Sequence, residues 1–120
     1  MKKLREDYKF FMKLFSKNGY IMYNRHLAKK TKPNVAIYYG ELFARMEMLY
    51  NKESLSEDNY FSYTVEQMLN FTGVPKKSQQ NAREILVKMG LIEAVRRGNP
   101  YRWYFKILLD KDSLHKAFIG

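Results

Sequence analysis

One stretch of the sequence, from Tyr60 to Ile107, restricts the fold more than any other part of the chain. Thr64 is followed three residues later by Gln67, a pair typical of the capping box that starts a helix. Gly73 favours the end of that helix, and Pro75 suits the first turn of the next one. Two helices separated by so tight a turn form a helix-turn-helix unit.

The second helix of this unit is expected from about Lys76 to Met89, with apolar residues on one face and polar residues on the other. Two strands follow, Ile92 to Arg96 and Tyr101 to Leu108, joined by a turn at Arg97-Gly98-Asn99-Pro100. A further strand, Tyr60 to Tyr63, precedes the first helix. This order of elements predicts an α+β fold, a winged helix-turn-helix.

Two helices are expected just upstream of this unit. Asn24 is placed to cap a short helix, Arg25 to Lys30, and Asn34 to cap the longest helix, roughly Val35 to Asn51. Between them, Lys29-Lys30-Thr31-Lys32 is a basic connector, which is either a solvated loop or a contact to a phosphate backbone.

Packing inside the long helix is also predicted. Gly40 costs about 1 kcal/mol relative to alanine in a helix, which suggests that another segment approaches closely there. Met46 and Met48 are expected to fill the core. Leu69 is assigned to the buried side of the first helix of the helix-turn-helix. Tyr20 to Tyr23 is predicted to be a short strand or an extended segment.

The N-terminus carries an extra amphipathic helix, because Leu4, Tyr8, Phe11 and Phe15 fall on one helical face. Such a helix covers its own domain, contacts a second subunit or lies on an anionic membrane surface. Two carboxylates in it weaken the membrane interpretation, so we favour docking on the same chain or on a twin subunit.

The chain therefore divides into three parts. Residues 1–18 are the amphipathic helix, residues 19–108 the winged-helix domain, and residues 109–120 a C-terminal tail. In the tail, Asp112 or Ser113 is expected to cap a last short helical turn.

The charge of the chain indicates a polyanionic partner. Lys and Arg number 22 against 12 Asp and Glu, which gives a net charge of +10. So large an excess repels itself, and nucleic acid or an anionic membrane would relieve the repulsion. The absence of cysteine removes disulfides and thiol chemistry, and fits a reducing cytoplasm. No signal peptide and no membrane-spanning segment is recognised, so we expect a cytoplasmic protein without a membrane partner.

Catalytic patterns are missing from the sequence. His26 and His115 are far apart and lack a metal-ligand partner. The carboxylates of Glu53, Glu57 and Asp58 share a polar loop, which is more typical of a solvated loop than of a metal site. We therefore expect no enzyme activity, no metal, no cofactor and no small-molecule substrate.

The polar face of the predicted helix at 76–89 suits a DNA major groove, which admits one α-helix. Arginine pairs with guanine there, and asparagine or glutamine with adenine, while lysines suit phosphates. The alternative is an ordinary solvated face, which the scarcity of acids opposes. The candidate DNA-contacting residues on this helix are Lys76, Lys77, Gln79, Gln80, Asn81, Arg83 and Lys88.

The predicted hairpin adds Arg96, Arg97, Asn99 and Arg102 to this set. A wing with arginines can lie along the DNA backbone or enter a minor groove, whose negative potential attracts arginine. A charged hairpin edge also resists aggregation between sheets, and both roles are open.

The run YFSYTVEQMLNFTGVPKKSQQNAREILVKMGLIE followed by GNPYRWYFKI resembles the winged-helix N-terminal domains of replication initiators from Gram-positive plasmids and phages, including DnaD-like replisome organisers. YIMYNRHL and NVAIYYGELFARMEMLY extend the resemblance to about Tyr20–Leu108. It implies a helix in the major groove at repeated origin sites, a homodimer and contacts to replication proteins. The family's C-terminal helicase-recruiting domain has no room here, so the chain is either a fragment or a stand-alone protein.

We thus expect sequence-specific binding of double-stranded DNA in replication initiation of a plasmid or phage. Two alternatives stay open: a winged-helix transcriptional regulator, and a protein-interaction or oligomerisation module of the replisome.

Overall fold

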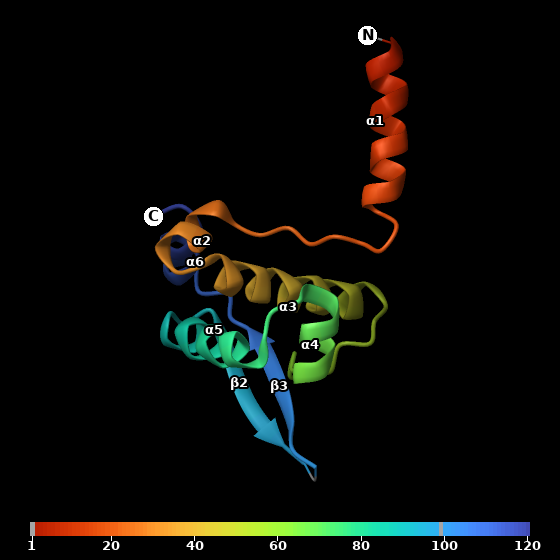
Figure 1. Cartoon of the computed structure of the whole chain (residues 1–120). Coiled ribbons are helices and arrows are strands. Elements are labelled where there is room, and N and C mark those ends of the chain that lie inside the picture. Colours follow the sequence, from red (N-terminus) through yellow and green to blue (C-terminus); the bar gives the residue numbers. More distant parts are fainter. Residues whose placement is uncertain (1, 99) are drawn as a thin grey trace.

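The computed structural model describes residues 2–98 and 100–120, with side chains from residue 3 (Figure 1). The described residues form six helices and one small sheet. In chain order the elements are α1 (Lys2–Phe15), α2 (Arg25–Lys30), α3 (Pro33–Asn51), β1 (Phe61–Ser62), α4 (Val65–Thr72), α5 (Lys76–Lys88), β2 (Ile92–Arg97), β3 (Arg102–Ile107) and α6 (Lys111–Phe118). The expected α+β order of strand, helix, turn, helix and hairpin is confirmed.

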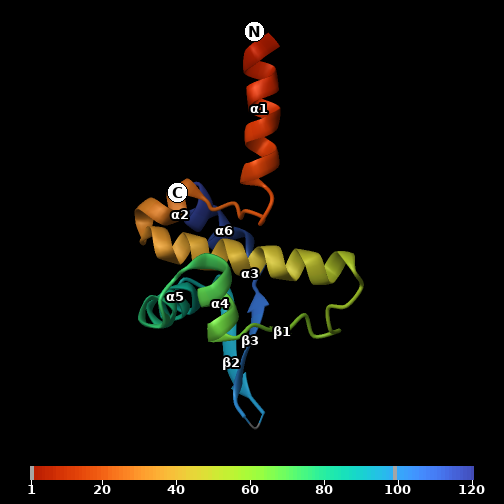
Figure 2. The ribbon, with the colours of Figure 1, turned by 45° about the vertical axis from the view of Figure 1, so that its right-hand side comes forward.

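The sheet is antiparallel, with β3 between β1 and β2. Ile92 pairs with Ile107 at the base of the β2–β3 hairpin, and Arg97 pairs with Arg102 near its tip. The hairpin projects away from the helices (Figures 1 and 2). It therefore has the position of a wing, with its apolar end in the core and its arginine-rich end in solvent.

The core lies where α3 packs against α5 and β3. The apolar stripe of α3 is buried at Val35, Tyr38 and Leu42, and Ala82 and Leu86 of α5 lie against it in the same core. Ala82 is completely inaccessible, so the small side chain lets the two helices approach closely. This packing fixes the outer face of α5.

The ends of α4 match the prediction. The hydroxyl oxygen of Thr64 accepts a hydrogen bond from the Gln67 backbone N–H at 3.0 Å, and the Gln67 side-chain oxygen accepts one from the Thr64 N–H at 3.0 Å. Gly73 ends the helix with φ of +78°, a conformation that favours glycine. Both signals are local, which is why the sequence locates them correctly.

Two helix starts were predicted wrongly. Lys32, not Asn34, occupies the N-cap position of α3, because Pro33 has a φ already suited to the first helical position. Asp110, not Asp112 or Ser113, caps α6, since its carboxylate accepts hydrogen bonds from the N–H and the hydroxyl of Ser113 at 3.0 and 2.9 Å. The expected tail is thus a helix, which packs on α2.

Two packing expectations are corrected. Met48 and Leu69, both assigned to the interior, are exposed, because each lies beside the buried stripe of its helix and not within it. Of the two states predicted for Tyr20–Tyr23, a short strand or an extended segment, the structure has the extended segment. This segment crosses α3 with Met22 over Gly40, as the glycine predicted.

The close approach at Gly40 should make a methyl group costly there. A Cβ atom at Gly40 would overlap the Met22 carbonyl oxygen. We expect Gly40→Ala to lower the free energy of unfolding by about 1–3 kcal/mol through overpacking, in spite of alanine's better helix propensity. Glu47→Ala, at an exposed position of the same helix, is the control. Urea denaturation followed by circular dichroism measures both, and a Gly40→Ala variant as stable as the parent would contradict the packing.

Candidate nucleic-acid interface

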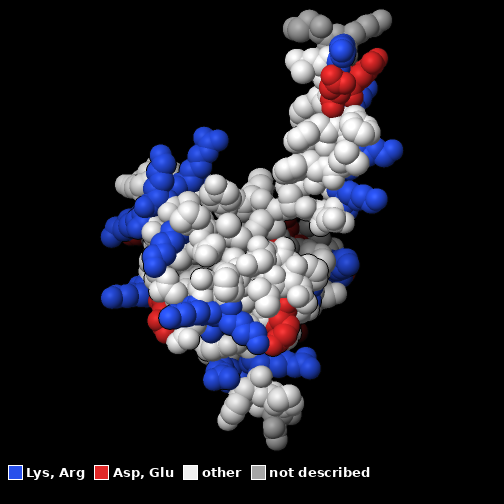
Figure 3. Space-filling view, viewed as in Figure 1, with Lys and Arg blue, Asp and Glu red and all other residues white. Residues whose placement is uncertain are grey.

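A groove separates the outer face of α5 from the β2–β3 hairpin. It is lined by four basic side chains and one acidic side chain, together with Gln80 and apolar residues that include Trp103. The charged residues are Lys76, Arg83, Lys88, Arg96 and Glu84. Figure 3 shows Lys and Arg over the α5 region and at the base of the hairpin on this face, with acidic groups at their edges.

Gln79 is not part of this surface, so its assignment as a DNA contact is wrong. Only 1% of its surface is exposed. Its side-chain amide donates hydrogen bonds to the carbonyl oxygens of Val65, at 3.1 Å, and Val74, at 3.0 Å. Gln79 therefore joins the start of α4 and the turn to α5, and it sets the angle between the two helices.

The other polar residues of α5 differ in their exposure and in the contacts of their side chains. Lys77, Gln80 and Lys88 are exposed, and Asn81 is half-buried. The Gln80 amide lies 3.3 Å from the Glu84 carboxylate, and Lys76 pairs with Glu66 of α4 at 3.6 Å. Both contacts are in solvent, where such pairs contribute little, so these side chains can exchange them for a ligand.

Trp103 on β3 holds two arginines in the groove. The guanidinium carbon of Arg83 lies 4.4 Å from a ring centroid of Trp103, and that of Arg96 lies 5.3 Å from it. Both distances are within the range of cation–π attraction. Arg83 also lies near Tyr38. Burial raises the pKa of Tyr38 to about 12, and the nearby Arg83 opposes that rise.

Arg97 on the hairpin is held by a second aromatic group. Its guanidinium carbon is 4.5 Å from the Tyr60 ring centroid and 5.4 Å from that of Tyr104, and it pairs with the Asp58 carboxylate at 3.8 Å. Hydrogen bonds from the Ser56 hydroxyl and the Tyr60 N–H hold the pKa of Asp58 below its usual value. The loop before β1 thus places a carboxylate beside this arginine.

The remaining hairpin residues are less constrained. Arg102 is exposed, and Arg96 also lies 5.7 Å from the Tyr101 ring centroid. Asn99, predicted to contact DNA, lies outside the described residues.

The structure adds a basic region that the sequence revealed only in part. It lies at the end of the molecule formed by α2 and α6, where Figure 3 shows several Lys and Arg side chains. The Lys30 ammonium group donates to the Lys116 carbonyl oxygen at 3.5 Å, which joins the two helices. The run at 29–32 was visible as a connector, but the cations of α6 come from the other end of the chain. The exposed cations here are Arg25, Lys29, Lys30, Lys32, Lys111 and Lys116.

Within the described part of the chain, no group of three or more His, Asp or Glu side chains is placed to hold a metal ion. The described helices also include none that is long and apolar enough to cross a membrane.

No protein-family model matches the sequence, and no curated protein matches it significantly. Two solved structures are similar to the chain: one described as the N-terminal domain of a DNA-binding protein, and one as the structure of a Rep–DNA complex. In both cases the TM-score is 0.55 and the identity 19%, over 78% of this chain and 75% of the other. The likeness supports the winged-helix-like fold.

Two adjacent glutamines should behave very differently when replaced. Gln79→Ala removes the donors from two carbonyl groups, and we expect it to lower the free energy of unfolding by about 1–3 kcal/mol. The matched control is Gln80→Ala, whose exposed side chain should change stability by no more than about 0.5 kcal/mol. Urea denaturation of both variants is the measurement, and equal losses would show that Gln79 does not join α4 to α5.

Proposed function

We propose that this chain binds double-stranded DNA through α5 and the β2–β3 hairpin, in replication initiation of a plasmid or phage. The observation that carries the proposal is the groove in which Arg83 and Arg96 lie against Trp103, between an exposed polar helix face and a projecting hairpin. One of the similar structures is described as a Rep–DNA complex, which agrees with this function.

In the proposed complex, α5 enters the major groove. Gln80, Asn81 and Arg83 are the candidate base readers, because amide and guanidinium groups form paired hydrogen bonds with base edges. Gln80 is the best placed of the three, since it is exposed and its only described hydrogen bond is a weak one to Glu84. Arg83 can contact a base in two ways. Its guanidinium group either leaves the Trp103 ring, or stays stacked on the ring and binds the base from there.

The phosphate contacts are proposed on both sides of α5. Lys76, Lys77 and Lys88 belong to the helix itself, and Arg96, Arg97 and Arg102 belong to the hairpin. Lys29, Lys30 and Lys32 are exposed at the α2–α6 end. They extend the basic surface beyond α5, and Figure 3 shows several Lys and Arg side chains at that end. Contacts of this kind set register and affinity but carry no sequence information.

Duplex binding should depend steeply on salt. About six phosphate contacts predict a log–log slope of binding constant against salt near −5, at about −0.9 per contact. Fluorescence anisotropy of a labelled duplex across a salt series measures the slope. If the chain fails to bind any duplex at low salt, the DNA proposal is wrong, and an interaction module of the replisome is the better explanation.

Base readers and phosphate contacts can be separated by substitution. Gln80→Ala should weaken binding to the specific DNA site of the chain by about 1–3 kcal/mol. Binding to duplexes of random sequence should stay almost unchanged. Arg97→Ala should weaken binding to both kinds of duplex equally, and should reduce the slope of the binding constant against salt. Equal losses on specific and random DNA for Gln80→Ala would remove Gln80 from the base-reading set.

A transcriptional regulator would use the same surface, so the bound sequence has to distinguish the two. Selection of bound duplexes from a pool of random sequences identifies the bound sequence. Repeated half-sites support an initiator at an origin, and a single palindrome supports a regulator.

A further inference from the structure

Helix α1 carries a large apolar face that the other described residues leave largely uncovered. The helix projects away from the body in both ribbon views (Figures 1 and 2). Six of its large apolar side chains have more than half of their surface exposed: Leu4, Tyr8, Phe10, Phe11, Leu14 and Phe15. A helix of this length is marginal in water unless its apolar face is buried, so the face needs an occupant.

The body of the same chain carries an apolar groove. Its walls come from the linker after α1, from one side of α3, and from the segment around α6. Met22, Tyr23 and Leu109 are among the wall residues, and each has more than half of its surface exposed. The groove also contains Gly40, Phe43 and Phe118. The chain thus has an uncovered apolar helix and an unfilled apolar groove.

The two apolar surfaces are continuous. The rings of Phe11 and Phe15 stack with centroids 5.4 Å apart, and Phe15 lies 5.6 Å from the ring of Tyr20 in the linker. The linker then passes Met22 and Tyr23 along the groove. Figure 3 shows mainly uncharged atoms between the base of α1 and the α2–α6 end.

We propose that the occupant is a second copy of this chain, with the α1 of each copy in the groove of the other. Each chain carries one helix and one groove. In a twofold-symmetric dimer each helix fills the groove of the other chain, so no helix or groove is left to bind a third copy. Six aromatic and aliphatic side chains offer on the order of 600 Å² per helix. Two such helices contribute on the order of 1,200 Å², to which the surface of the two grooves adds, so the interface reaches the roughly 1,200–2,000 Å² of a standard stable interface.

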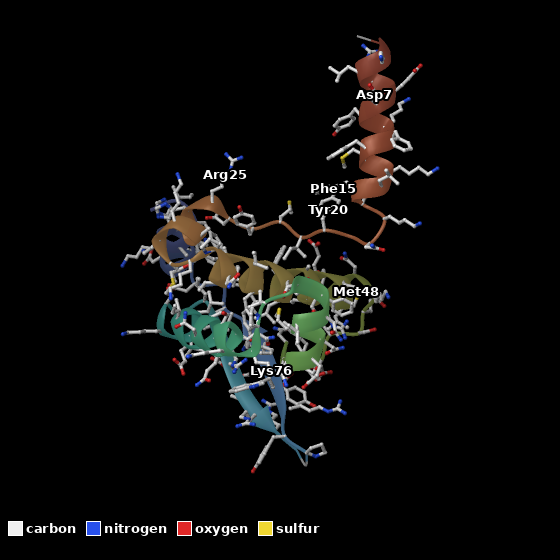
Figure 4. All side chains as sticks on the ribbon, viewed as in Figure 1. Asp7, Phe15, Tyr20, Arg25, Met48 and Lys76 are labelled. Atoms are coloured by element: carbon white, nitrogen blue, oxygen red, sulfur yellow. The ribbon has the colours of Figure 1, made fainter. Side chains whose placement is uncertain are left out.

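The position of one carboxylate, and not the net charge of α1, distinguishes the second copy from a lipid surface, because the Lys and Arg residues of α1 outnumber its acids. On a helical wheel Asp7 falls between Phe11 and Leu14, inside the apolar face, and Lys3 falls between Phe10 and Leu14. At a lipid interface the long Lys3 side chain reaches the headgroups, but the shorter Asp7 carboxylate would lie against acyl chains. At the groove, Arg25 and Lys111 flank the lining segments and are exposed. Figure 4 shows Arg25 on the side of the body toward which α1 projects, where it can meet Asp7 of another copy.

The exchange leaves the proposed DNA-binding hairpin free, because the hairpin points away from α1 (Figure 2). The proposal therefore does not depend on DNA binding and is tested without DNA.

Sedimentation equilibrium of the full chain is the first test. We expect a concentration-dependent dimer of twice 14.4 kDa. Phe11→Glu on the apolar face of α1 and Leu109→Glu on the groove should each leave only monomer. Both residues are exposed, so neither change disturbs the core. Lys13→Glu, on the polar face of α1, and Lys52→Glu, away from the groove, introduce the same side chain and should stay dimeric.

Mixing the two monomeric variants is the decisive test. The Phe11→Glu chain keeps an intact groove, and the Leu109→Glu chain keeps an intact helix, so the mixture has one intact helix–groove contact. We expect a heterodimer in the mixture although neither variant dimerises alone.

Four results would overturn the proposal. A monomeric parent chain at every concentration would mean that α1 folds onto its own groove or stays free. A dimer that persists in Phe11→Glu would exclude α1, and one that persists in Leu109→Glu would mean that helix pairs with helix. Tight binding of monomeric chain to phosphatidylglycerol vesicles, lost in Phe11→Glu, would assign α1 to a lipid surface.

Discussion

The packing of α3 against α5 is the contact on which the rest of the domain depends. Ala82 and Leu86 have no exposed surface, and the buried stripe of α3 covers them. Because the inner face of α5 is fixed in this way, its outer face has one orientation relative to the hairpin. Gln79 adds a directional constraint through its two hydrogen bonds to the α4 side of the turn.

The arginines of the groove and of the hairpin are positioned mainly by aromatic rings. Arg83 and Arg96 share Trp103, and Arg97 lies against Tyr60. An aromatic face orders a guanidinium group without neutralising its charge, so the positive potential of the groove is kept. Asp58 beside Arg97 is the exception, and it is an exposed pair that a phosphate can replace.

The two ends of the molecule have different chemistry. The hairpin end is cationic and polar, whereas the surface between the base of α1 and the α2–α6 end is mainly uncharged (Figure 3). A chain that used only the first surface would gain nothing from the six exposed apolar side chains of α1. The division of surfaces supports two partners, DNA at one and a second copy of the chain at the other.

The sequence by itself determined what local interactions decide. The capping box at Thr64, the αL glycine at 73 and the spacing of Ala82 and Leu86 each involve neighbours within a few residues, so the helix-turn-helix and the wing could be predicted.

Only the tertiary structure decided which polar groups are buried and which apolar groups are not. The burial of Gln79 depends on carbonyl groups 14 and 5 residues away. The basic α2–α6 end joins segments 86 residues apart, and the exposure of α1 depends on whether a distant surface covers it. Periodicity identifies an apolar face, but the partner of that face is set by contacts between distant parts of the chain or between chains.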